Sequence, residues 1–135
     1  PDQTERILLF QDRFNETNPG EITGIVALIE RLSGASIPLF GLSNFSAEFW
    51  PDFRVNKPIF DCFQDIIISG EEKLVKPDPA IYALALERFQ KEAGQCLFID
   101  DRLDNISGAQ AMGIAGHVFE TTATLELELQ RLALL

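Results

Sequence analysis

Apolar residues recur along this chain in two alternating patterns, and the alternation predicts its architecture. Segments whose apolar positions repeat every three or four residues predict amphipathic helices, whereas short unbroken apolar runs predict strands covered on both faces. The chain predicts helices over residues 3–15, 22–32, 80–90, 106–112 and 121–132, strands over 37–42, 65–69, 96–99 and 115–119, and a short helix or irregular aromatic segment over 45–53. The alternation of strand and helix indicates an α/β fold, with a parallel sheet between layers of helices.

The length and composition of the chain indicate a single domain and argue against some classes of partner. A chain of 135 residues, 46% of them apolar, can bury the core of one globular domain. No window approaches the roughly 18 uninterrupted apolar residues that cross a bilayer, and the first residues show no signal-peptide pattern, so we expect a cytoplasmic protein. The net charge of −10, from 21 acidic against 11 basic residues, opposes binding to nucleic acid or to anionic membranes.

Cysteine and histidine contribute little candidate chemistry. Cys62 and Cys96 have no metal-type spacing and sit among apolar residues, which predicts buried free thiols. The only histidine is His117, so sites built from several imidazoles are excluded. We expect His117 to be a strand residue.

Two adjacent carboxylates, Asp100 and Asp101, follow the strand predicted over 96–99. Adjacent acids repel each other, and packing them at the edge of a sheet costs free energy unless a cation or a hydrogen-bond donor compensates. An isolated pair of this kind often means only that one aspartate caps the next helix while the other is solvated. A positive group nearby would favour a functional role.

Three polar clusters fall where a parallel sheet binds ligands, outside the carboxyl ends of its strands. Ser43 and Asn44 follow one strand, Lys76 precedes the helix after the next, and the Asp100-Asp101 pair ends a third. Separately, the first two residues could be turn formers and the lysine a surface residue. Together, a hydroxyl, an ammonium and two carboxylates can hold a phosphoryl group beside Mg²⁺, which is satisfied by one or two carboxylates plus the phosphate.

The ordered set of motifs resembles the haloacid dehalogenase-like hydrolase superfamily, in its subgroup of small-molecule phosphatases. The likeness runs over essentially the whole chain. It implies a Rossmann-like parallel sheet sandwiched by helices, with the remnant of a helical cap. The residues that carry it are Leu42-Ser43-Asn44, Lys76-Pro77-Asp78-Pro79 with Ile81-Tyr82, and Phe98-Ile99-Asp100-Asp101 followed by Asn105 and Gly108-Ala109.

The resemblance also implies a reaction and a role for each phosphate-binding residue. It implies a Mg²⁺-dependent phosphatase that acts on a small phosphorylated metabolite through an aspartyl-phosphate intermediate. Ser43 would bind a phosphoryl oxygen with assistance from Asn44, and Lys76 would neutralise the phosphate and the nucleophile.

The same resemblance assigns the acidic pair to the metal. Asp101 would ligate Mg²⁺ directly. Asp100 and Asn105 would support it by ordering a metal-bound water or Lys76.

The chain departs from the family at the nucleophile. Members attack phosphorus with the first Asp of an Asp-x-Asp motif on an N-terminal strand, and neither Asp2 nor Asp12 follows a predicted buried strand. We therefore interpret residues 1–20 as the end of a helical cap and 21–135 as a core that lacks its first, central strand. Removing a central strand leaves a gap of roughly 10 Å, which a missing N-terminal segment or another chain must fill.

We accordingly expect a C-terminal portion of a longer phosphatase that is inactive by itself. Two alternatives stay open: a non-catalytic phosphate-binding or pseudoenzyme module, and a 2-haloacid dehalogenase. The dehalogenase subgroup needs no Mg²⁺ and carries a Ser-Asn-type segment in place of Asp100-Asp101, which favours phosphoester chemistry here. A response-regulator receiver domain also combines acids, a hydroxyl and a lysine around Mg²⁺. Its acids come first in the sequence and its lysine last, so the reverse order in this chain argues against that fold.

Overall fold

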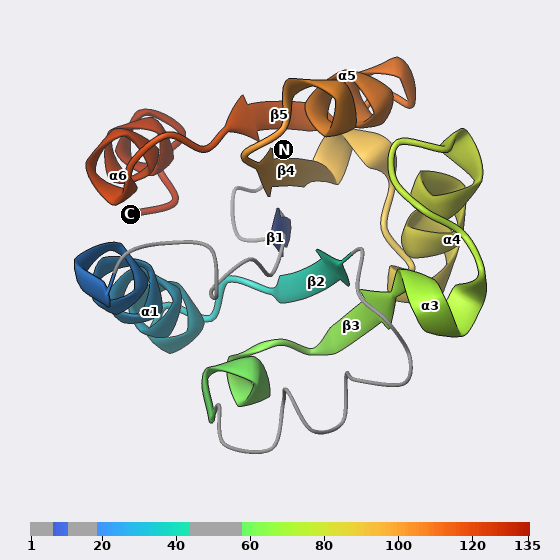
Figure 1. Cartoon of the computed structure of the whole chain (residues 1–135). Helices are drawn as coiled ribbons and strands as arrows, with labels where there is room; N and C mark the ends of the chain where they lie inside the picture. Colours follow the sequence, from blue (N-terminus) through green and yellow to red (C-terminus); the bar gives the residue numbers. More distant parts are fainter. Residues whose placement is uncertain (1–6, 11–18, 44–57) are drawn as a thin grey trace.

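A five-stranded parallel sheet forms the centre of the molecule, with the strand order β3-β2-β1-β4-β5 (Figure 1). The computed structural model describes residues 7–10, 19–43 and 58–135. The described elements, in chain order, are β1 (Ile7–Phe10), α1 (Pro19–Gly34), β2 (Leu39–Ser43), the 3₁₀ turn η3 (Pro58–Cys62), β3 (Asp65–Ile68), α3 (Ser69–Glu72), α4 (Pro79–Phe89), the 3₁₀ turn η4 (Ala93–Gln95), β4 (Cys96–Asp100), α5 (Leu103–Ala111), β5 (Ala115–Val118) and α6 (Thr122–Arg131). The predicted α/β fold with a parallel sheet is confirmed.

The central strand β1 corrects the sequence analysis. The helix predicted over 3–15 is wrong for Ile7–Phe10, which form this strand. Leu9 pairs in parallel with Phe40 of β2 on one side and with Phe98 of β4 on the other. A four-residue apolar run is too short for its periodicity to separate a helical face from a buried strand. Tertiary pairing decides, because the flanking strands would otherwise leave two rows of backbone groups without partners.

The same strand overturns the expected gap in the sheet. The position between β2 and β4 is occupied by residues of this chain, so the sheet does not lack a central strand. Asp12, which was expected to have no preceding strand, comes two residues after the end of β1 and lies outside the described residues. The assignment of residues 1–20 to a cap stays a prediction for the parts on either side of β1.

The other predicted helices and strands are confirmed, with ends that move by a few residues. α1 is longer than its apolar pattern and begins at Pro19. α4 begins where predicted because the Asp78 carboxylate accepts a hydrogen bond from the Ala80 amide and Pro79 occupies the first turn. Residues 45–53, predicted as a short helix or irregular segment, lie outside the described part of the chain.

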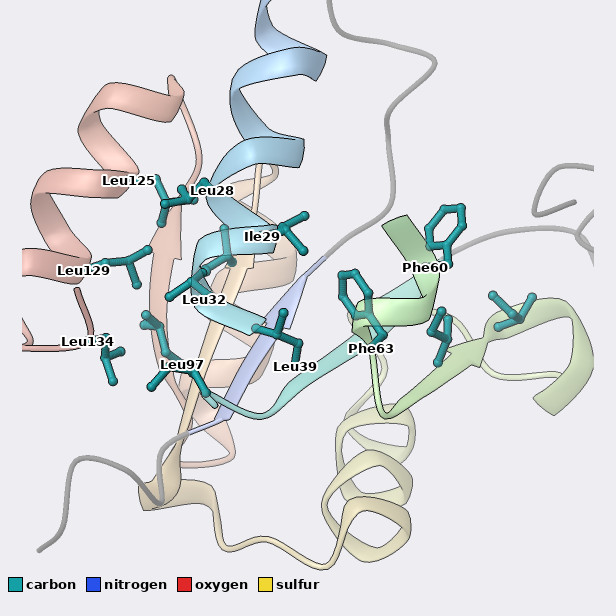
Figure 2. Packing of buried hydrophobic residues seen from close by; sticks show 14 residues of the cluster. Leu28, Ile29, Leu32, Leu39, Phe60, Phe63, Leu97, Leu125, Leu129 and Leu134 are labelled. Carbon is teal, nitrogen blue, oxygen red and sulfur yellow. The ribbon is translucent and has the colours of Figure 1, made fainter. Parts of the chain in front are cut away.

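The core lies in two layers, one on each face of the sheet. Alternate residues of β4 point to opposite faces, so Leu97 and Ile99 join one cluster while Cys96 and Phe98 join the other. The first cluster lies under α1 and α6, where Leu28, Ile29, Leu32, Leu125 and Leu129 meet (Figure 2). The second lies under α4 and α5. At the carboxyl edge of the sheet, β2 and β4 end in the polar residues Ser43 and Asp100.

Several smaller expectations can be checked in the described residues. Cys62 and Cys96 are free thiols, and burial raises the pKa of Cys96 to about 12. Cys62, however, is only partly buried. His117 lies in β5 as predicted. Among the helices described, none is long and apolar enough to cross a membrane.

Candidate functional site

The predicted site residues that the structure describes lie at or beside the carboxyl edge of the sheet. All five strands run parallel, so the ends of β2 and β4 lie at the same edge. Ser43 is the last residue of β2 and Asp100 the last of β4. Lys76 lies in the loop between α3 and α4, and Asn105 in the first turn of α5.

A buried cluster joins three of these residues. Lys76 donates a hydrogen bond from Nζ to Oδ2 of Asp100 at 2.9 Å, and Asn105 donates from Nδ2 to the same oxygen at 3.0 Å. The other carboxylate oxygen, Oδ1, accepts from the Arg102 backbone amide at 2.9 Å. Residues 24 positions apart in the sequence thus meet at one carboxylate.

Burial makes this ion pair electrostatically strong. The side chains of Lys76 and Asp100 are both 0% exposed, and Asn105 is 2% exposed. The ammonium also lies over the ring of Phe98, 5.4 Å from its centroid. Taking two charges out of water costs several kcal/mol per ion, which is offset only by close pairing and additional hydrogen bonds, as found here.

The positive group expected beside the aspartate pair is therefore, for Asp100, the ammonium of Lys76. Both Asp100 oxygens accept hydrogen bonds from protein donors. This geometry suits a carboxylate that orients other groups better than one that ligates a metal directly. The supporting role that the resemblance implies for Asp100 stays a prediction.

Asp101 differs from its neighbour because it is exposed at the start of the loop after β4. It follows the last residue of β4 at the carboxyl edge of the sheet, and Mg²⁺ prefers oxygen ligands such as carboxylates. The described residues contain no group of three or more His, Cys, Asp or Glu side chains that could hold a metal. The donor set fits a Mg²⁺ ion that keeps waters and takes further oxygens from a phosphate.

Arg102 and Asp104 form an exposed ion pair next to the cluster. Nε and Nη2 of Arg102 each lie 3.2 Å from a carboxylate oxygen of Asp104. The hydrogen bond from Arg102 lowers the pKa of Asp104 from its usual value. Asp104 also accepts from the Asn105 amide, and it therefore helps to begin α5.

The loop that carries Lys76 is anchored by a second ionic cluster. Arg88 of α4 forms two hydrogen bonds to Asp65 at the start of β3, at 2.8 and 3.0 Å, and one to Glu72 of α3 at 2.7 Å. These contacts raise the pKa of Arg88. They tie β3 and α3 to α4, so both ends of the loop between α3 and α4 are fixed.

Gly108 explains part of the motif after the aspartate pair. A Cβ at this position would come within 2.9 Å of Cβ of Pro77 and within 3.0 Å of Cε2 of Tyr82. Glycine is therefore needed for α5 to approach the loop that follows Lys76. The neighbouring Ala109 is fully buried in the core cluster under α4 and α5.

The structure describes only the backbone of Ser43 and nothing of Asn44. The backbone of Ser43 pairs with Ile68 of β3, which puts it at the carboxyl edge. Asn44 lies outside the described residues. Their contribution to phosphate binding stays a prediction.

One participant was not identified as a site residue from the sequence. The hydroxyl of Tyr82 donates to the Asn105 carbonyl at 2.7 Å, and its ring packs edge-on against Phe98. The Ile81-Tyr82 pair was the only signal, because it forms part of the family motif.

The fold and this cluster define an α/β protein whose polar site lies at the carboxyl edge of a parallel sheet. The family model for haloacid dehalogenase-like hydrolases matches residues 17–113. The chain belongs to the haloacid dehalogenase-like hydrolase family.

Curated relatives include phosphatases. The chain is 30% identical over 109 residues to the sesquiterpene phosphatase astK of Aspergillus oryzae, a match that covers 80% of this chain and 55% of that protein. It is 31% identical over 88 residues to the phosphoglycolate phosphatase of Photobacterium profundum, covering 65% of this chain and 38% of that protein. The chain thus spans about half or less of the length of these relatives.

Solved structures show the same fold. A protein of uncharacterised function from Corynebacterium glutamicum superposes with a TM-score of 0.79 at 18% identity, covering 95% of this chain and 94% of that one. A HAD family enzyme from Bacteroides thetaiotaomicron, crystallised with magnesium and inorganic phosphate, gives a TM-score of 0.67 at 19% identity, covering 86% and 94%. At these identities, the likeness supports the fold alone.

Proposed function

We propose that this site binds the phosphoryl group of a small phosphorylated metabolite together with Mg²⁺. In a longer protein it would serve a phosphatase that forms an aspartyl-phosphate intermediate, and the nucleophilic aspartate would have to come from outside the centre of the sheet, which β1 of this chain already occupies. The observation that carries the proposal is the buried contact of Lys76 and Asn105 with one oxygen of Asp100, beside the exposed Asp101. Support comes from the names of the two curated relatives and from the magnesium and phosphate in the structural neighbour.

Each residue has a distinct task in this proposal. Lys76 supplies a fixed positive charge in a site of low dielectric constant, where preorganised charges act most strongly. Asp100 and Asn105 hold the ammonium in place. Asp101 would hold Mg²⁺, which when bound neutralises charge on the phosphoryl oxygens. Ser43 and Asn44 would donate hydrogen bonds to the same oxygens.

The sequence after β1 lacks the Asp-x-Asp motif that supplies the nucleophile in this family. The residues after β1 are Gln11, Asp12 and Arg13, so no pair of aspartates stands two positions apart there. We infer that the isolated chain binds its ligands but does not turn them over. This feature also favours the second candidate function, a non-catalytic phosphate-binding module.

The purified 135-residue chain is expected to show no hydrolysis of a phosphomonoester such as p-nitrophenyl phosphate in the presence of Mg²⁺. The reason is that the residues directly after β1 contain no pair of aspartates two positions apart, the motif from which the family takes its nucleophile. Release of p-nitrophenol over time, compared with a buffer blank, measures this. Clear turnover that disappears in Asp101→Ala would contradict the inference.

Binding is expected where turnover is not. Asp101→Asn, which keeps size and removes charge, should weaken Mg²⁺-dependent binding of inorganic phosphate at least about tenfold, equivalent to about 1.4 kcal/mol. Isothermal titration calorimetry of phosphate with and without Mg²⁺ measures the effect. Asp61→Asn is the matched control, because Asp61 lies in η3 before β3, toward the opposite edge of the sheet. Equal affinities of the wild type and Asp101→Asn would refute the metal role.

A further inference from the structure

Tyr82 contacts the cluster of Lys76, Asp100 and Asn105 directly at Asn105, and it reaches Lys76 through the ring of Phe98. Its hydroxyl donates to the Asn105 carbonyl at 2.7 Å in the buried interior. Its ring meets the ring of Phe98 edge-on, with centroids 5.7 Å apart at an interplanar angle of 78°. The Phe98 ring also contacts the Lys76 ammonium, which lies 5.4 Å from the ring centroid.

We propose that Tyr82 is a positioning residue that keeps the side chains of Asn105 and Lys76 on the same oxygen of Asp100. Because the contact is to the Asn105 backbone, it fixes the first turn of α5 relative to α4. The inference rests on the proposed function for its effect on ligand binding, but its structural part can be tested separately.

The surroundings leave Tyr82 little freedom to do anything else. The side chain is 0% exposed, and the missing Cβ of Gly108 lets α5 approach the ring. A buried hydroxyl without a partner costs free energy, so the hydrogen bond to Asn105 is retained. Burial, with the charges of Asp100 and Asp104, raises the pKa of Tyr82, and the phenol therefore remains a neutral donor.

The effect on Asn105 follows from the helix geometry. The amide of Asn105 already bonds to Asp104, and that of Arg102 to Asp100. Both contacts join residues that are adjacent or nearly adjacent in the sequence, so they stabilise the start of α5 locally. Tyr82 adds the contact from another helix, which orients the turn so that Nδ2 of Asn105 faces Asp100.

Tyr82→Phe tests the proposal because it removes one oxygen and keeps the ring. In the variant we expect the side-chain amide protons of Asn105 to exchange with solvent about fivefold faster, as loss of a typical net hydrogen bond predicts. We also expect Mg²⁺-dependent affinity for inorganic phosphate to fall by a similar factor. Proton exchange is measured by NMR on ¹⁵N-labelled protein, and affinity by calorimetry.

Phe89→Leu is the matched control. Phe89 is a buried residue of α4, the helix that also carries Tyr82, and its ring stacks on the ring of Phe40 with centroids 4.1 Å apart. This variant therefore also weakens the packing of α4. It should leave Asn105 exchange and phosphate affinity unchanged at a temperature where both variants are folded. Equal changes in both variants, or no change in Asn105 exchange in Tyr82→Phe, would overturn the positioning role.

The two proposals fail differently. If the wild-type chain binds no phosphate with Mg²⁺, the proposed function is wrong, while Asn105 exchange still decides the role of Tyr82. If the wild type binds phosphate and Tyr82→Phe exchanges and binds like the wild type, only the positioning role is wrong.

Discussion

Replacing Lys76 with methionine is expected to lower the free energy of unfolding by about 3–5 kcal/mol, the typical cost of breaking a buried ion pair. Methionine fills a similar volume, so the loss comes mainly from charge. The buried Asp100 carboxylate would keep the hydrogen bonds from Asn105 and the Arg102 amide but lose its counter-charge. Urea denaturation followed by circular dichroism measures the change. Phosphate binding should be lost as well.

A double-mutant cycle separates the interaction energy of the ion pair from the stability lost because the lysine side chain no longer packs in the core. Lys76→Met combined with Asp100→Asn removes both charges, so the double variant should be destabilised by less than the sum of the single variants. Lys91→Met, at a half-buried lysine outside the cluster, is the control and should change stability by less than about 1 kcal/mol. Additive effects in the cycle would show that the contact between Lys76 and Asp100 contributes nothing.

Leu9→Pro is expected to lower the free energy of unfolding by at least about 2 kcal/mol. Leu9 lies in the central strand and pairs with neighbours on both sides. Proline removes a backbone donor, and a buried carbonyl left without its partner costs about 1–3 kcal/mol before the clash of the ring is counted. Urea denaturation measures the loss of stability, and hydrogen exchange of the Leu8–Phe10 amides shows whether this segment is protected in the wild type.

Leu9→Val is the control for this prediction, because it keeps the backbone donor and a side chain that favours strands. It should cost less than about 1.5 kcal/mol. If Leu9→Pro unfolds at the same urea concentration as the wild type, residues 7–10 do not occupy the centre of the sheet. The sequence interpretation of this segment as part of a cap would then be restored.

The pattern of apolar residues was enough to predict most of the fold. Strands such as Cys96–Asp100 are short and wholly apolar until their last residue, and helices such as Pro79–Phe89 are marked by a cap and a proline. These signals are local, so they can be read without knowing what packs against them. Ile7–Phe10 carries no such flanking signal, and its partners β2 and β4 come later in the chain. Its conformation depends on pairing and not on periodicity.

The candidate site, like the fold, was predicted in part from local sequence pattern and decided in part by tertiary packing. The sequence alone determined that Ser43, Lys76 and the Asp100-Asp101 pair follow strands and so meet at one edge of a parallel sheet. Only the tertiary structure decided that Lys76 is the counter-charge of Asp100, that Asp101 remains exposed, and that Tyr82 stands behind Asn105. The reason is physical, because the local pattern of apolar residues shows which strand a polar residue follows. Distances, burial and the sharing of one oxygen depend on how α4 and α5 pack against the sheet.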